Sequence, residues 1–97
     1  MFAFDWNPAK AAINLRKHSV SFDLAATVFQ DPLMKSIFDR SHSEFEERWI
    51  TMGQTKDGQL LVVSHTYAQT ASEETSVRLI SARPATRNER RQFEVGE

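Results

Sequence analysis

The sequence of 97 residues contains no cysteine. This absence excludes a disulfide framework, a zinc site built from thiolates and a cysteine nucleophile, and it is typical of proteins in a reducing compartment. Long hydrophobic runs are missing as well, because no apolar run approaches the roughly 20 residues that a membrane-spanning helix needs. The first 14 residues carry Asp5 and Lys10, where a secretory signal needs an uninterrupted apolar stretch. We therefore expect a cytoplasmic protein that does not associate with membranes.

Glycine is scarce, with three residues. The sequence has no glycine-rich phosphate loop, Gly-x-Ser-x-Gly turn, His-Glu-x-x-His helix or calcium-binding loop. The three histidines, His18, His42 and His65, lie in different predicted elements and no two are four residues apart. A metal site would have to be assembled by the fold from distant residues, so the sequence predicts no metal and no cofactor.

Hydrophobic residues make up 40% of the chain and aromatic residues 10%. A chain of this length buries roughly two-thirds of the surface that its unfolded form exposes, which suffices for one small core. No internal repeat, low-complexity tract or linker interrupts the pattern. We expect residues 1–97 to form a single domain.

The first third of the sequence predicts a short strand and two helices. Residues 2–6 form an aromatic strand candidate. Asn7-Pro8 combines a capping amide with proline at the first helical position and begins a helix that runs to about His18. Ser21 caps a second helix, whose apolar residues recur at helical spacing until Asp31-Pro32 ends it.

The rest of the sequence predicts strands followed by a helix. Four segments rich in β-branched, aliphatic and aromatic residues are separated by turn signals: 33–38, 48–54, 59–67 and 75–83. The consecutive apolar residues 60–63 indicate a central strand that is covered on both faces. A last helix begins after Thr86, where Thr86 and Glu89 fit a capping box. The expected fold is α+β, with two N-terminal helices and a C-terminal helix packed on a four-stranded, mainly antiparallel sheet.

Positive charge is concentrated near the C-terminal end, although the net charge is only −1. Residues 78–91 contain five arginines, no lysine and one acid, so this segment is +4 and the remainder is −5. The planar guanidinium group pairs with phosphate through two parallel hydrogen bonds. The segment is either a solvated helix face or a phosphate-binding surface, and its start inside an apolar strand favours the second interpretation.

The remaining polar residues suit cleavage of a phosphodiester bond through the 2′-hydroxyl of RNA itself. This reaction needs a base, an acid and fixed positive charge for the developing phosphorane. Lys17 and His18 end the first predicted helix, where they either act on RNA or complement the helix dipole.

Three further residues have two interpretations each. His65 alternates with apolar residues of its strand, which favours a core histidine over a proton carrier. Arg48 follows two glutamates and either forms a surface ion pair or contributes positive charge to a site. Arg83 ends a strand and is expected to face the last helix with phosphate between them. The candidate catalytic residues are Lys17, His18, Arg48, His65 and Arg83, and the candidate RNA-binding residues are Arg78, Arg87, Arg90 and Arg91.

Several short motifs follow one another from residue 14 to residue 91. The most specific are Lys17-His18 with Val20 and Phe22, Arg78-Leu79-Ile80-Ser81-Ala82-Arg83, and Glu89-Arg90-Arg91. Further matching segments are 14–18, 29–32, 42–44, 46–49 and 62–66. In this order, and over nearly the whole chain, the motifs resemble the BrnT family of toxins from bacterial type II toxin–antitoxin systems.

The resemblance implies a RelE-like fold and translation arrest by RNA cleavage. It also implies neutralisation by a BrnA-like antitoxin with a ribbon-helix-helix domain, which alone contacts operator DNA when the complex represses its own operon. Two residues depart from the family pattern. Ser19 replaces a glycine, and Phe93 stands where the family often has tyrosine, whose hydroxyl a phenyl ring lacks.

Two other functions fit the same residues. One is a non-enzymatic module that binds RNA or a protein through the arginines, and the other is a partner that serves only in corepression with an antitoxin. Arginine substitutions should weaken binding in a metal-independent endoribonuclease and in a binding module alike, whereas histidine substitutions should abolish an activity only in the endoribonuclease. A partner that serves only in corepression should cause no growth arrest when it is expressed without the antitoxin.

Overall fold

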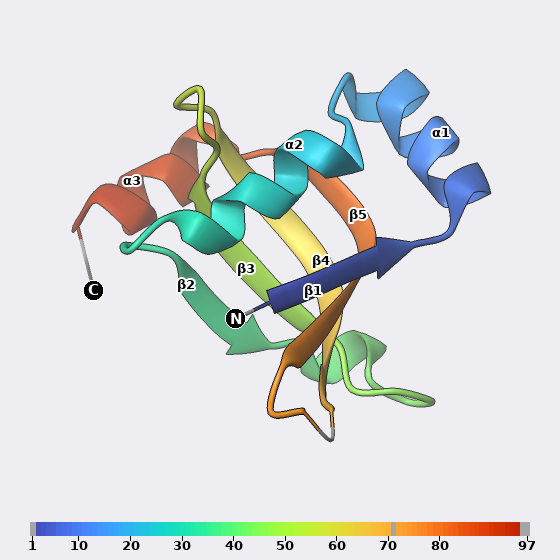
Figure 1. Cartoon of the computed structure of the whole chain (residues 1–97). Coiled ribbons are helices and arrows are strands. Elements are labelled where there is room, and N and C mark those ends of the chain that lie inside the picture. Colours follow the sequence, from blue (N-terminus) through green and yellow to red (C-terminus); the bar gives the residue numbers. More distant parts are fainter. Residues whose placement is uncertain (1, 71, 96–97) are drawn as a thin grey trace.

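The computed structural model of the chain describes residues 2–70 and 72–95. Five strands, three α-helices and two 3-10 turns are arranged as Figure 1 shows. Their bounds are β1 (Phe2–Trp6), α1 (Pro8–His18), α2 (Phe22–Ala26), η1 (Thr27–Gln30), β2 (Lys35–Phe38), η2 (Arg40–His42), β3 (Trp49–Gln54), β4 (Leu60–Gln69), β5 (Thr75–Pro84) and α3 (Arg87–Val95).

The strands form one sheet in the order β1-β5-β4-β3-β2. Strands β2 to β5 are successive antiparallel neighbours, as the sequence predicted. The predicted number of four strands is wrong, because β1 adds a fifth strand at the edge and pairs in parallel with β5. This pairing joins Phe2 to Thr75 and Trp6 to Leu79. Residues 2–6 have a strand pattern, but no local signal indicates a partner at the far end of the chain.

Both ends of α1 are capped. The Asn7 Oδ1 atom accepts hydrogen bonds from the N–H groups of Ala9 and Lys10, at 2.9 and 3.1 Å. At the other end, Ser19 is left-handed with φ of 58°, and its N–H donates to the carbonyl of Leu15 at 2.9 Å. A serine therefore fills the left-handed position that more often holds glycine, at some cost in backbone strain.

The second helix is shorter than expected. Its predicted cap is confirmed, since Ser21 Oγ accepts a hydrogen bond from the Leu24 N–H at 3.0 Å. After Ala26 the chain continues as η1. Strand β3 passes so close to η1 that a Cβ atom on Gly53 would lie 2.9 Å from Val28 Cγ1. Because glycine has no Cβ atom, β3 can pack this closely against η1.

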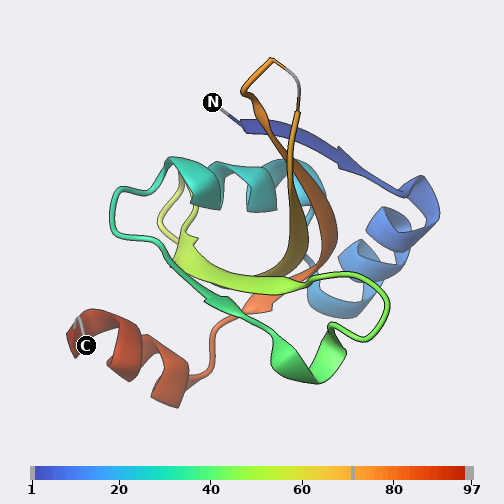
Figure 2. The ribbon, with the colours of Figure 1, turned by 90° about the horizontal axis from the view of Figure 1, so that it is seen from below.

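The helices lie on both sides of the sheet. Figure 2 shows α2 against one face and α3 on the opposite side. The core lies where α2 and η1 meet the sheet, and its buried apolar members are Val20, Phe22, Ala25, Val28, Phe29, Leu61, Val63, Val77, Leu79 and Ala82. Within residues 2–70 and 72–95, no helix is long and apolar enough to span a membrane.

One buried amide joins α1 to β5. Asn14 is 5% exposed. Its Nδ2 donates to the carbonyl oxygens of Val20, at 3.0 Å, and Ala82, at 2.8 Å, and its Oδ1 accepts from the Ala82 N–H at 3.0 Å. Strand β1 pairs with β5 only as far as Leu79. The Asn14 side chain therefore takes the place of a neighbouring strand for backbone groups that would otherwise be buried without partners.

Replacing Asn14 by alanine should lower the free energy of unfolding by about 3 kcal/mol, because Val20 and Ala82 would lose three hydrogen bonds of about 1 kcal/mol each. Chemical denaturation followed by circular dichroism measures the change. Leu15→Ala is the matched control, since Leu15 is 51% exposed and surface substitutions change stability by about 0.5 kcal/mol or less. Equal stability of the two variants would show that the amide does not hold α1.

Candidate active site

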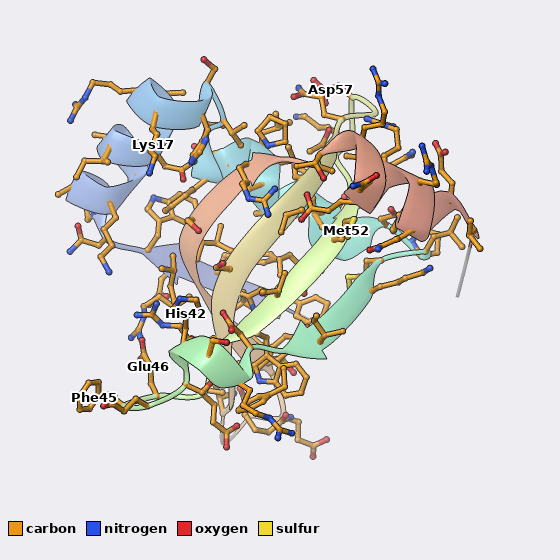
Figure 3. All side chains as sticks on the ribbon, turned by 180° about the vertical axis from the view of Figure 1, so that it is seen from behind. Lys17, His42, Phe45, Glu46, Met52 and Asp57 are labelled. Atoms are coloured by element: carbon orange, nitrogen blue, oxygen red, sulfur yellow. The ribbon has the colours of Figure 1, made fainter. Side chains whose placement is uncertain are left out.

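The sheet has an apolar face toward α2 and a polar face that points the other way. Along β4, Val63 belongs to the core beneath α2, so Val62 and Thr66 point to the opposite face. The register places Arg83 across from Val62 and Arg78 across from Thr66. We call this surface the distal face, and Figure 3 views the molecule from its side. It also carries two serines paired across β4 and β5, Ser64 and Ser81.

Two predicted cations meet at one carboxylate beside the distal face. Arg78 donates a hydrogen bond to Glu46 Oε2, and Arg48 Nε lies 3.7 Å from Glu46 Oε1. The hydrogen bond from Arg78 lowers the pKa of Glu46, and the charge of Arg48 lowers it further. The ion pair predicted for Arg48 is therefore confirmed. It also brings Arg48 and Arg78 together, which no sequence pattern indicated.

A shallow pocket of about 280 Å³ opens next to these arginines. Its lining residues come from η2 and the loop that precedes β3: His42, Glu44, Phe45, Glu46 and Arg48. Figure 3 shows His42, Phe45 and Glu46 together at the end of the sheet opposite Asp57. His42 was not among the candidate site residues that the sequence indicated. The local signal was the spacing Asp39-x-x-His42, since His42 Nδ1 lies 2.9 Å from Asp39 Oδ2.

Arg83 is the second-last residue of β5, one residue before the end of the strand, and its guanidinium pairs with a carboxylate. Its guanidinium donates two hydrogen bonds to Glu89, at 2.8 and 2.9 Å. Glu89 also accepts from the Thr86 N–H at 2.8 Å, and Thr86 Oγ1 accepts from the Glu89 N–H at 3.1 Å. The predicted capping box is confirmed. The expectation that phosphate binds between Arg83 and α3 is not supported, because the guanidinium of Arg83 already donates both hydrogen bonds to Glu89.

The three arginines of α3 project from a helix that is anchored by its only buried side chain. Arg87, Arg90 and Arg91 are exposed, whereas Phe93 is 9% exposed. Lys35 Nζ donates to the Phe93 carbonyl at 3.3 Å and lies 5.4 Å from the centre of the ring. The phenyl ring therefore serves in packing at the position where the resemblance implied a tyrosine hydroxyl.

His65 lies in the core between β4 and η1. It has no exposed surface, and its Nε2 is 2.6 Å from Thr51 Oγ1. Its ring packs at right angles to Phe29 and Tyr67, with centroids 4.9 and 4.7 Å away. Burial lowers the pKa of His65 to about 4, so the ring is neutral at neutral pH. The core interpretation is confirmed, and the assignment of His65 to proton transfer is not supported by this position.

Lys17 and His18 occupy the last turn of α1, where positive charge complements the helix dipole. Lys17 is exposed and His18 is half-buried. Figure 3 shows Lys17 on α1, apart from His42 and Glu46. Lys17 therefore lies apart from Glu46, the carboxylate that Arg48 and Arg78 share. Among the described residues, no three His, Asp or Glu side chains are grouped so that they could hold a metal ion.

Residues 6–89 match the sequence model of a family described as "Ribonuclease toxin, BrnT, of type II toxin-antitoxin system". The chain belongs to the BrnT family. Membership implies endoribonuclease activity and an antitoxin as partner. The motifs of residues 14–91 that resemble the BrnT family lie almost wholly within the matched residues.

The fold agrees with this BrnT membership. The chain is similar to the 1.1 Å crystal structure of the Brucella abortus ribonuclease toxin BrnT, with a TM-score of 0.57 and 17% sequence identity over 90% of this chain and 99% of that chain. At this identity the similarity shows the fold alone, so the predicted α+β class is confirmed with five strands instead of four. No curated protein matches the sequence.

The ion pair of Arg83 and Glu89 makes the stability of this BrnT-family protein depend on pH. Hydrogen bonds from Arg83 lower the pKa of Glu89 from 4.5 to about 2, and Glu89 in turn raises the pKa of Arg83. Above pH 4.5 the carboxylate is ionised in the folded and the unfolded chain, so its stabilising effect is complete. The effect is lost as the pH falls from 4.5 toward 2.

At about pH 7, the free energy of unfolding of the Glu89→Gln variant should be about 1 kcal/mol lower than that of the wild type, a loss typical of a well-formed surface ion pair. Denaturant titrations at several pH values should show this difference shrinking below pH 4.5. Glu94→Gln is a control in the same helix, since the Glu94 carboxylate lies 4.0 Å from Arg90 and is 64% exposed. A difference for Glu89→Gln that stays constant in acid would contradict the prediction.

Proposed function

We propose that this BrnT-family protein cleaves messenger RNA and thereby arrests translation and growth. The observation that carries the proposal is the meeting of Arg48 and Arg78 at Glu46, beside the distal face. Arginine is a cation with five N–H donors, and both guanidinium groups are partly exposed. An RNA phosphate, which pairs with arginine in the same bidentate manner as a carboxylate, would compete with Glu46 for them.

The chemistry that fits these groups is metal-independent transesterification through the 2′-hydroxyl of RNA. The attacking O2′ atom forms a bond to phosphorus and the P–O5′ bond breaks, while Arg48 and Arg78 stabilise the negative charge that develops on the phosphorane. The exposed arginines of α3 bind other phosphates of the RNA, and Lys17 and His18 contact the RNA beside α1. Arg83 acts by positioning α3 through Glu89.

The antitoxin that membership implies is, in our proposal, a BrnA-like protein with a ribbon-helix-helix domain. It neutralises the toxin by covering the arginines, and the complex represses its own operon with the antitoxin alone touching operator DNA. The charge distribution supports this arrangement, because the segment 78–91 is +4 and offers a cationic surface to an acidic or apolar part of the antitoxin.

Inducible expression in a bacterium tests the ribonuclease proposal. The wild type should stop growth and generate new RNA 5′ ends that carry a hydroxyl group, as transesterification requires. Arg78→Ala should slow cleavage on the order of 10²-fold, because one stabilising group of the transition state is lost. Growth curves and sequencing of hydroxyl 5′ ends measure both effects.

Lys56→Ala is the control for this experiment. Lys56 is an exposed cation in the turn between β3 and β4, and the Asp57 next to it lies at the opposite end of the sheet from Glu46 (Figure 3). Its substitution should leave the arrest unchanged. Normal growth and unchanged RNA with folded wild-type protein would overturn the proposal in favour of a non-enzymatic binding module.

Chemical modification of arginine tests the mode of neutralisation. Phenylglyoxal should modify Arg48, Arg78 and Arg90 more slowly in the toxin–antitoxin complex than in the free toxin, because a bound partner excludes the reagent. Peptide mass spectrometry measures each site, and Arg40, an exposed arginine of η2, provides an internal reference. Equal modification of the three arginines in both states would show that the antitoxin binds elsewhere.

A further inference from the structure

Within residues 2–70 and 72–95, His42 is the only exposed histidine that pairs with a carboxylate, and it lies beside Arg48. The His42 side chain is 67% exposed, whereas that of Asp39 is 12% exposed. In the neutral ring, a proton on Nδ1 donates to Asp39 Oδ2 across 2.9 Å, which leaves the lone pair of Nε2 free. A carboxylate that fixes the tautomer of a histidine in this way prepares the other nitrogen to accept a proton.

Hydrogen bonds hold this pair at a fixed position relative to Arg48. Ser43 Oγ donates to the Asp39 carbonyl at 2.5 Å and accepts from the Arg48 N–H at 3.0 Å. The Asp39 N–H donates to the Arg48 carbonyl at 2.8 Å, and the His42 N–H to the Asp39 carbonyl at 3.3 Å. Backbone and side-chain contacts of this kind supply the preorganisation that proton transfer to a bound substrate needs.

His42 and Arg48 also line the same pocket, of about 280 Å³, which is open to solvent. Phe45 stands at its rim with 95% of its surface exposed. An exposed ring beside cations offers a stacking surface for a nucleotide base. The pocket therefore combines candidate contacts for a base and a phosphate with an exposed histidine.

We propose that His42 is the general base of RNA cleavage and that Asp39 is its positioning residue. This inference rests on the proposed ribonuclease function. His42 Nε2 takes the proton of the 2′-hydroxyl as the O2′–P bond forms and the P–O5′ bond breaks. The leaving O5′ atom takes a proton from water, and the imidazolium, stabilised by Asp39, then releases its proton to water. The products are a 2′,3′-cyclic phosphate and a 5′-hydroxyl, without any further reactant.

The charged groups around His42 have opposing effects on this step. Asp39, Glu44 and Glu46 favour the imidazolium that forms, and Arg48 opposes it. Arg78 opposes it less, because its charge is shared with Glu46. The same two arginines stabilise the phosphorane, so the base and the charge-stabilising groups act on neighbouring atoms of the substrate.

Single-turnover cleavage of RNA by the purified toxin tests the assignment, on naked RNA and in a translating extract. His42→Ala should lower the rate constant by about 10²–10⁴-fold and leave the affinity for a 2′-deoxy substrate analogue within about twofold of the wild type. Asp39→Asn should lower the rate about 10-fold, because the amide still contacts the ring without stabilising its charge. Lys56→Ala should cleave at the wild-type rate.

Imidazole added to the solution separates a base from a structural role. Because the pocket is open to solvent, uncharged imidazole should restore at least about a tenth of the wild-type rate to folded His42→Ala. It should not accelerate Arg78→Ala, which is slow for lack of positive charge. Full activity of His42→Ala, or a slow His42→Ala that imidazole cannot rescue, would overturn the assignment and leave the ribonuclease function standing. A wild type that cleaves no RNA in either assay would overturn the ribonuclease function itself.

Discussion

The buried amide of Asn14 is the constraint on which the arrangement of the helices around the sheet depends. Strand β1 covers the edge of β5 only as far as Leu79, and beyond that point the backbone of Ala82 has Asn14 as its partner. The third hydrogen bond, to Val20, ties the turn after α1 to the same side chain. One residue therefore fixes α1 and the turn before α2 relative to β5, the strand that carries Arg78 and Arg83.

Carboxylates hold the arginines on which the proposed function depends. Glu46 holds Arg48 and Arg78 beside the distal face, and Glu89 holds Arg83 while it caps α3. Each ion pair orders long side chains before a ligand binds, which reduces the conformational entropy that these side chains lose on binding. In the proposed function, a phosphate has to displace Glu46 to reach both guanidinium groups. An RNA or an acidic segment of an antitoxin would meet the same requirement.

Burial distinguishes His65 from His42, which residue type alone leaves equivalent. His65 is enclosed by aromatic rings, and burial lowers its pKa to about 4, so it serves as a neutral core residue with a hydrogen bond to Thr51. Alternation along β4 predicted this position. His42 stands in a polar loop without any periodic pattern, and only the folded loop shows Asp39 at its Nδ1 atom and Arg48 in the same pocket.

The sequence by itself determined the features that depend on neighbours in the chain. These are the caps of Asn7, Ser21 and Thr86, the helix and strand segments, and the order of motifs that indicated the BrnT family. Tertiary structure alone decided the parallel pairing of β1, the meeting of Arg48 with Arg78, and the occupation of Arg83 by Glu89. Local signals arise from backbone geometry within a few residues, whereas the pairing of β1 and the meeting of Arg48 with Arg78 join distant segments whose register only the packed core fixes. The contact of Arg83 with Glu89 spans only six residues, but it depends on how α3 is placed after β5.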